Sequence, residues 1–146
     1  MDMTKMPMPS EDMSVTFTLI VNNVARSRDF YSKVLGGEVA MEGDEQGTPA
    51  MVKLANTWII INIGGGPTDD KPTVTARPPS DPNTISAFMN LRVPDIALVY
   101  EQWRAGGAEF LTEPKDHVRE IRAYMRDPDG YLIEVGQTKR EAMESK

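Results

Sequence analysis

The 146-residue sequence lacks cysteine, which excludes disulfides, zinc sites built on cysteine and thiol nucleophiles. It also lacks an excess of basic residues, because 22 Asp and Glu face 16 Lys and Arg. Nucleic acid is therefore not an expected partner, since binding to phosphates needs a basic face. The apolar run Trp58 to Ile61 is far too short to cross a membrane, and residues 1–13 carry no apolar signal core. We expect a cytoplasmic protein with no membrane partner.

Hydrophobic residues make up 40% of the chain, enough for the core of one compact domain. We predict a flexible arm over residues 1–13, a domain over 14–137 and a charged tail over 138–146. Five prolines fall within residues 64–84, and they make helix or central strand unsuitable there. Such a segment is typical of a linker between modules or of a functional flap.

An internal repeat divides the predicted domain into module one (14–65) and module two (85–137). The segment Val21-Asn-Asn-Val-Ala25 matches Val93-Pro-Asp-Ile-Ala97 at an offset of 72 residues, and Asn62 matches Glu134 at the same offset. Pairs of glycines, at 36/37 and 106/107, align after a small gap. These matches indicate an internal duplication.

Each module shows the same order of elements. Alternating apolar residues predict a first strand around 17–21 and around 89–93. Asn23 and Asp95 suit helix N-caps, and the glycine pairs suit helix ends. Three strands then complete each module, at about 38–42, 50–54 and 58–63 in the first and 109–112, 121–126 and 131–135 in the second. The prediction is βαβββ twice.

Two segments resemble motifs of the vicinal-oxygen-chelate superfamily, which includes glyoxalases, extradiol dioxygenases, methylmalonyl-CoA epimerases and bleomycin-resistance proteins. "NNVARSRDFYSKVLGG", from Asn22, resembles its opening strand–helix motif, and "RDPDGYLIEV", from Arg126, resembles its closing hairpin. The resemblance covers about residues 14–136. It implies an α+β fold in which two βαβββ modules form a cupped, mixed, mostly antiparallel sheet. It also implies helices on the outer face, a ligand in the cup and a homodimer.

The strand alternation assigns residues to the two faces of such a sheet. A uniformly apolar set would face the helices: Phe17, Leu19, Val21, Ile59, Ile61, Ile63, Met89, Leu91, Val93, Ile133 and Val135. The cup face would mix aromatic, amide, hydroxyl and charged groups, which suits a small-molecule site. The ligand contacts that we predict there are Thr16, Thr18, Trp58, Asn62, Phe88, Asn90, Arg92, Tyr124 and Glu134.

The resemblance also locates the metal ligands of metal-dependent relatives, on the first and last strand of each module. In this chain those positions hold Thr16, Asn62, Phe88 and Glu134. Only Glu134 is a usual ligand type for the superfamily, and phenylalanine cannot ligate a metal. We therefore expect no cofactor. The alternative is a divalent metal held by Glu134, with His117 as a further candidate ligand.

Glu134 and His117 each have more than one interpretation. Glu134 is a remnant ligand position, a catalytic base with a raised pKa, or a structural carboxylate that pairs with Arg92 or Asn90. His117, the single histidine, is a general base at the rim of the cup or an exposed loop residue.

Three classes of function remain open at this point. The first is a glyoxalase/bleomycin-resistance-like protein that binds a small organic molecule without metal. The second is a metal-dependent lyase, isomerase or dioxygenase that uses Glu134. The third is a protein-interaction module with a vestigial cup.

Overall fold

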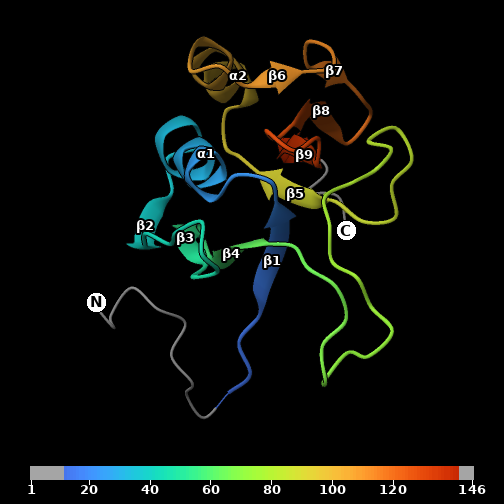
Figure 1. The fold of residues 1–146 in the computed structure, drawn as a ribbon. Coiled ribbons are helices and arrows are strands. Elements are labelled where there is room, and N and C mark those ends of the chain that lie inside the picture. The colour runs from blue at the N-terminus through green and yellow to red at the C-terminus, as the bar shows by residue number, and fades with distance from the viewer. Residues whose placement is uncertain (1–11, 142–146) are drawn as a thin grey trace. The chain divides into compact units, whose positions relative to one another are not determined.

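The computed structural model describes residues 12–141, and the ends of the predicted arm and tail lie outside that range. The chain divides into two compact units, Met1–Pro78 and Pro79–Lys146 (Figure 1). The division falls between two of the prolines of the segment 64–84. No helix within residues 12–141 is both long and apolar enough to cross a membrane.

The first unit has the predicted order βαβββ. Its sheet has the strand order β1-β4-β3-β2, in which β1 and β4 are parallel and the other neighbours are antiparallel. Its elements are β1 (Thr16–Val21), α1 (Val24–Asp29), η2 (Phe30–Val34), β2 (Glu38–Met41), β3 (Ala50–Leu54) and β4 (Thr57–Ile63).

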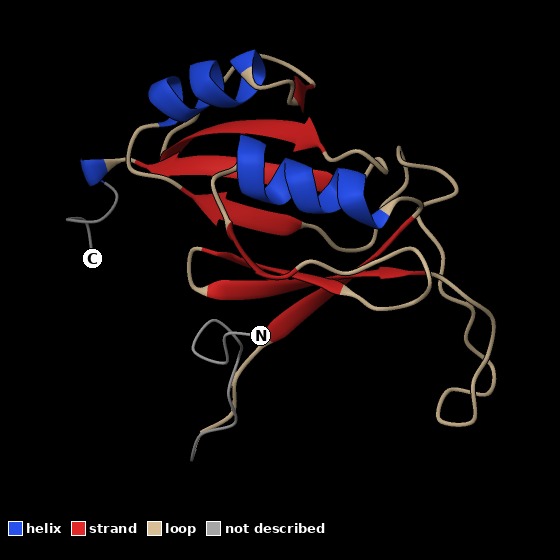
Figure 2. Ribbon diagram, turned by 60° about the vertical axis from the view of Figure 1, so that its left-hand side comes forward, coloured by secondary structure: helices blue, strands red, loops and turns tan. Residues whose placement is uncertain are grey.

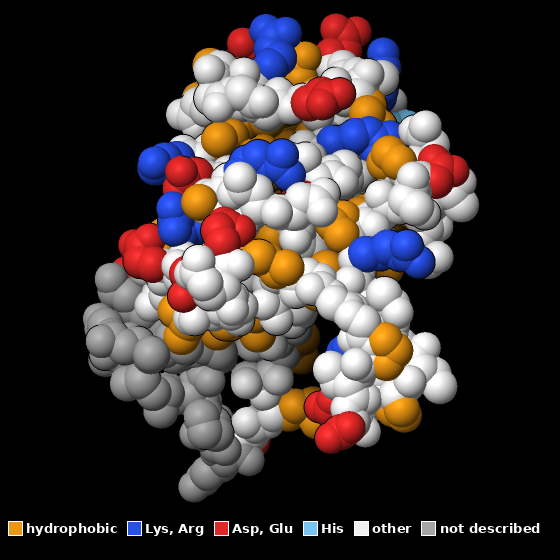
Figure 3. All heavy atoms as spheres, in the orientation of Figure 1, with side chains coloured by type: hydrophobic (Ala, Val, Ile, Leu, Met, Phe, Trp, Pro, Cys, Tyr) orange, Lys and Arg blue, Asp and Glu red, His pale blue; other side chains and the backbone are white. Residues whose placement is uncertain are grey.

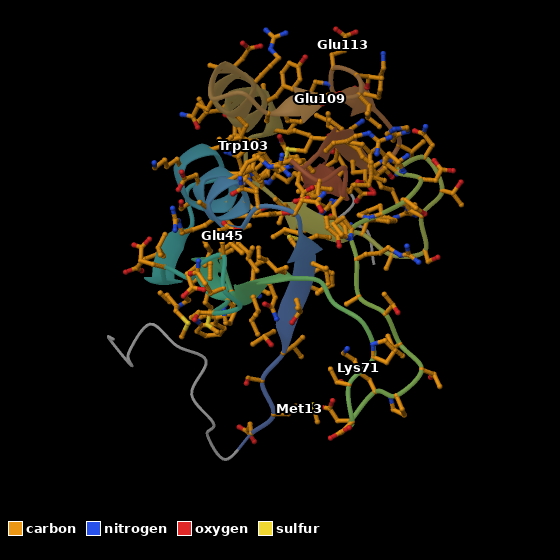
Figure 4. All side chains as sticks on the ribbon, viewed as in Figure 1. Met13, Glu45, Lys71, Trp103, Glu109 and Glu113 are labelled. Carbon is orange, nitrogen blue, oxygen red and sulfur yellow. The ribbon has the colours of Figure 1, made fainter. Side chains whose placement is uncertain are left out.

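The helix of the first unit begins at the predicted cap. The side chain of Asn23 accepts a hydrogen bond of 2.9 Å from the backbone N–H of Arg26, as an N-cap should. Glu45, which lies beside α1 in Figure 4, accepts from the N–H of Val24 at 3.2 Å. The last turns are π-helical, and the N–H of Leu35 donates to the carbonyl of Phe30. Two side chains thus satisfy amide groups that the helix itself leaves unpaired.

The second unit has the same order with one additional short strand, β7. Its sheet has the order β5-β9-β8-β6, with β5 and β9 parallel and β7 paired to β8. Its elements are β5 (Met89–Arg92), α2 (Ile96–Ala105), β6 (Glu109–Phe110), β7 (Lys115–Asp116), β8 (Glu120–Arg126) and β9 (Leu132–Thr138). Asp95 caps α2 as predicted, and Gln137 accepts from the N–H of Ile96 at 2.9 Å.

The predicted α+β fold with two βαβββ modules and mostly antiparallel strands is confirmed, with the strands in two sheets, one in each unit. Several strand ends differ from the prediction. β6 is shorter than 109–112, and β9 continues to Thr138 instead of ending at Val135. Pairing explains this difference, because β8 runs opposite β9 from Arg126 as far as Glu120, and Glu120 pairs with Thr138.

Each helix lies on one face of the sheet of its own unit (Figure 2). The core of each unit lies between that helix and that sheet. The buried side chains include Leu19, Val21, Ile59 and Ile61 in the first unit, and Ile133 and Val135 in the second, all predicted to face a helix. Phe17 was also predicted there but is 39% exposed. It stands near the start of β1, an edge strand, where less of the unit covers it.

The segment 64–84 contains neither helix nor named strand, as its prolines predict. Gly65 and Ala76 form an isolated antiparallel bridge with hydrogen bonds of 2.9 and 2.8 Å. Gly64 permits this return of the chain, since a Cβ there would overlap the carbonyl of Ala76.

Candidate functional site

The polar side chains of the second sheet gather on the face opposite α2. Three neighbouring strands, β5, β9 and β8, place residues side by side in rows across this face. One row is Asn90–Glu134–Tyr124, and the next is Arg92–Gly136–Arg122. Glu120 and Thr138 form the row after that. We call these eight residues the polar face.

Glu134 is the buried centre of the polar face, with 6% of its surface exposed. The hydroxyl of Tyr124 donates a hydrogen bond of 2.8 Å to its Oε1. Nη1 of Arg92 lies 3.5 Å from its Oε2. Both carboxylate oxygens therefore have a partner, as a buried charge requires. Of the alternatives for Glu134, the structure shows the ion pair with Arg92.

Arg92 joins three strands on this face. Its Nη1 lies 3.1 Å from Oε1 of Glu120, and its Nη2 donates to Oγ1 of Thr138 at 2.8 Å. A longer contact of 3.5 Å links Nη1 to Oδ1 of Asn90. The guanidinium lies directly over Gly136, since a Cβ at that glycine would overlap Nη1 and Cζ. Glycine thus makes room for the arginine side chain.

Tyr124 adds an aromatic part to the polar face. Burial raises the pKa of its hydroxyl, and so do the hydrogen bond to Glu134 and the negative charge of that carboxylate. The hydroxyl therefore stays a hydrogen-bond donor at neutral pH. The ring of Phe88 meets that of Tyr124 edge-on at a centroid distance of 6.1 Å, and Phe88 is 44% exposed.

Four predicted ligand contacts lie on the first sheet, on the face opposite α1. Thr16 stands beside Trp58 in the parallel pair of β1 and β4, Thr18 beside Ile60, and Ile20 beside Asn62. The ring of Trp58 lies under the ammonium group of Lys53, at 5.0 Å from its centroid. This face thus offers an aromatic ring with hydroxyl and amide groups.

The structure therefore brings Phe88, Asn90, Arg92, Tyr124 and Glu134 together in one unit. His117 is not among them: it is exposed and follows β7. Its backbone N–H donates to the carbonyl of Glu120, while its imidazole makes no hydrogen bond or ion pair within residues 12–141. The exposed-loop interpretation fits this position.

Sequence reasoning missed four residues of the polar face: Glu120, Arg122, Gly136 and Thr138. Extending the period-two alternation of β8 backwards from Tyr124 would have found Arg122 and Glu120. The alternation of β9 continued forwards from Glu134 gives Gly136 and Thr138, but we expected this strand to end at Val135 and assigned Thr138 to the tail.

The strand registers also give Glu134 a different counterpart in the first unit. The helix caps Asn23 and Asp95 keep the 72-residue offset, and so do Thr18 and Asn90. Thr18 pairs with Ile60, whereas Asn90 pairs with Glu134. Thr18 and Asn90 are equivalent positions of the two units, so their strand partners Ile60 and Glu134 are equivalent in the structure. Asn62 matches Glu134 in the sequence offset but not in strand pairing.

The donor set does not fit a divalent metal ion. Within residues 12–141, no group of three or more His, Cys, Asp or Glu side chains is placed to hold one. At the predicted ligand positions, Phe88 has no donor atom, and the carboxylate of Glu134 is already held by Tyr124 and Arg92. The guanidinium would also repel a second cation at this carboxylate.

Comparison with known proteins identifies a family and several similar folds. The family model described as Glyoxalase/Bleomycin resistance protein/Dioxygenase superfamily matches residues 14–135. An antibiotic-binding protein, TnmS3, from a Streptomyces species is similar with a TM-score of 0.63 and 20% identity, over 89% of this chain and 100% of that one. A fosfomycin resistance protein, FosX, from Listeria monocytogenes, complexed with Mn(II) and sulfate, has a TM-score of 0.64 and 17% identity, over 94% and 100%.

A third similar structure is a glyoxylase/bleomycin resistance protein/dioxygenase domain from a Frankia species. Its TM-score is 0.67 at 18% identity, over 90% of this chain and 95% of that one. At these identities the likeness concerns the fold. The family match agrees with the resemblance found in the two sequence motifs.

Proposed function

The chain belongs to the Glyoxalase/Bleomycin resistance protein/Dioxygenase superfamily, and on this basis we propose that it binds a small organic molecule without a metal ion. One observation carries the metal-independent part of the proposal. Arg92, a fixed cation of the protein, is paired with Glu134, the single predicted ligand position with a suitable side chain. That carboxylate is therefore committed to a structural network.

The chemistry of the polar face supports a small-molecule site. Phe88 and Tyr124 offer aromatic surface, and Asn90 and Arg92 offer polar groups beside it. Apolar surface with a few positioned polar groups is the usual lining of such sites. TnmS3, a protein of similar fold, is an antibiotic-binding protein, and the proposed ligand class includes molecules of that kind. Thr16, Thr18, Trp58 and Asn62 remain proposed contacts on the first unit.

Metal content and Glu134→Gln test this proposal together. We expect far less than one equivalent of Mn, Fe, Ni or Zn per chain in the freshly purified protein by elemental analysis, and the same content in the variant. We also expect Glu134→Gln to lower the free energy of unfolding by about 1–3 kcal/mol, since it removes one of the two carboxylates that pair with Arg92 and the charged acceptor of the Tyr124 hydroxyl. Native mass spectrometry of the same sample would report any retained organic ligand.

The opposite result supports the metal-dependent enzyme. One equivalent of a transition metal per chain, lost in Glu134→Gln, would show that the carboxylate is a ligand and would contradict the proposal. Glu109→Gln is the matched control. Glu109 belongs to the same unit and lies on the short strand β6 (labelled in Figure 4), where it pairs with Arg126 and not with a residue of the polar face.

A further inference from the structure

We propose that Arg92, Gly136 and Arg122 form a binding site for the carboxylate of an organic ligand, and that Glu120 occupies this site until a ligand replaces it. The inference rests on the proposed binding function and names the chemical class of the ligand. Its basis is the arrangement of two arginines around a glycine, with one internal carboxylate between them.

Strand pairing places the two arginines on either side of one glycine. Gly136 of β9 pairs with Arg92 of β5 and also with Arg122 of β8. Gly136 has no side chain, so no Cβ stands between the two arginines of this row. The guanidinium of Arg92 occupies the space over the glycine. A Cβ on Gly136 would overlap the guanidinium of Arg92 and would lie 3.0 Å from Oε1 of Glu120.

Glu120 takes the position that a ligand carboxylate would take. Its Oε1 lies 3.1 Å from Nη1 of Arg92, and its Oε2 lies 3.9 Å from Nη1 of Arg122. Each oxygen thus faces a different guanidinium: the contact with Arg92 is a hydrogen bond, and the longer one with Arg122 is an attraction between charges. The side chain of Glu120 is 26% exposed, and partly exposed ion pairs contribute little to stability. A ligand carboxylate can therefore replace it.

Arg92 has other partners that hold it when Glu120 leaves. Thr138 accepts from its Nη2 at 2.8 Å, and Glu134 pairs with its Nη1. Glu134 is itself held by Tyr124. Within residues 12–141, Nε of Arg92 has no acceptor, so this arginine keeps an N–H for a further ligand oxygen. Arg92 is thus held by two residues of β9, independently of Glu120.

The neighbouring row indicates what the carboxylate is attached to. The ring of Tyr124 lies 5.9 Å from the guanidinium carbon of Arg122 and is in edge contact with Phe88. A ligand whose carboxylate reaches the arginines would place its adjacent atoms over these rings. We therefore infer that the ligand is an aromatic or apolar organic acid.

Calorimetric titration of Glu120→Gln with benzoate, and with benzamide as its neutral counterpart, tests the inference. Glutamine keeps the shape of the side chain and removes the competing charge. We expect Glu120→Gln to bind benzoate about tenfold more tightly than the wild type does, with benzamide affinity unchanged. Replacing Arg122 by glutamine in the Glu120→Gln variant should abolish the gain. Thermal unfolding of each variant confirms that it is folded.

Glu113→Gln is the matched control, because Glu113 is an exposed glutamate of the same unit beyond β6 (Figure 4), paired with Lys115. It should bind benzoate as the wild type does. The inference is wrong if Glu120→Gln gains no more than Glu113→Gln, or if benzamide gains as much as benzoate. If the inference is wrong, retention of a neutral organic ligand in native mass spectrometry would still support the proposed function. One equivalent of metal bound through Glu134 would instead overturn the proposed function itself.

Discussion

At the scale of single residues, the polar face depends on how one buried carboxylate is compensated. Glu134 has a neutral donor, Tyr124, on one oxygen and a cation, Arg92, on the other. The interaction is reciprocal, since burial raises the pKa of the Tyr124 hydroxyl above its usual value of 10.0, and the hydrogen bond to Glu134 and its charge raise this pKa further. In the folded protein the tyrosine therefore keeps its proton to a higher pH than in the unfolded chain.

This linkage predicts how the effect of Tyr124→Phe depends on pH. At pH 8 both states hold the proton, and loss of the hydrogen bond should lower the free energy of unfolding by about 1–2 kcal/mol. As pH rises above about 10, the unfolded chain releases the proton first, and the wild type loses the stability that the protonated hydroxyl provides. Denaturant unfolding at pH 8 and pH 11 should show the difference between the two proteins shrinking. A difference that grows with pH would contradict the prediction.

At the scale of elements, the hairpin between β8 and β9 aligns Tyr124 with Glu134. Asp127 organises its turn: the carboxylate accepts from the N–H groups of Asp129 and Tyr131, each at 2.9 Å. Gly130 has a φ of +91°, and Arg126 donates to its carbonyl at 3.2 Å and to that of Pro82 at 2.8 Å. The turn thus fixes the register of the two strands and also binds the chain that leads into the unit.

Gly130→Ala should therefore destabilise the hairpin. A Cβ at this φ is strained, and it would lie 3.1 Å from Cβ of Pro82. We expect the free energy of unfolding to fall by about 1–2 kcal/mol, measured by denaturant unfolding. Gly66→Ala serves as control, because a Cβ at Gly66 would meet no other atom within 4 Å and the φ of Gly66 lies outside the left-handed region. Equal effects of the two substitutions would show that the turn does not need its glycine.

At the scale of the whole molecule, charge of both signs is distributed without a basic patch on the visible face. Figure 3 shows acidic and basic side chains intermixed on that face, consistent with a net charge of -6. The acidic net charge is the basis of our expectation that nucleic acid is not a partner. The superfamily resemblance in the sequence implies a second copy of the chain as the partner.

We expect sedimentation at micromolar concentration to give a mass of twice the 16.2 kDa chain. Homodimers close with two-fold symmetry and do not grow further, so a single species should persist as the concentration is raised. Moderate salt should change the mass little if the contact is mainly apolar. A clean monomer at these concentrations would contradict the expectation.

Much of the architecture could be predicted from the sequence because its signals are local. The caps Asn23 and Asp95, the five prolines of residues 64–84 and the alternation of β4 and β9 each act within a few residues. Together with the 72-residue repeat they predicted two βαβββ modules, and the family match agrees with them. The alternation of apolar and polar residues in β5, β8 and β9 also predicted that Arg92, Tyr124 and Glu134 lie on one face of the sheet.

The contacts themselves were decided by the tertiary structure. Arg92 is 28 residues from Glu120 and 46 from Thr138, and local pattern carries no information about which long side chains meet at such separations. The register of parallel strands is set by the pairing of whole sheets, which is why Glu134 corresponds to Ile60 and Thr138 belongs to β9. The sequence by itself therefore determined the modules and the composition of each face. Only the folded sheet decided that an arginine pairs with the carboxylate at the predicted metal position.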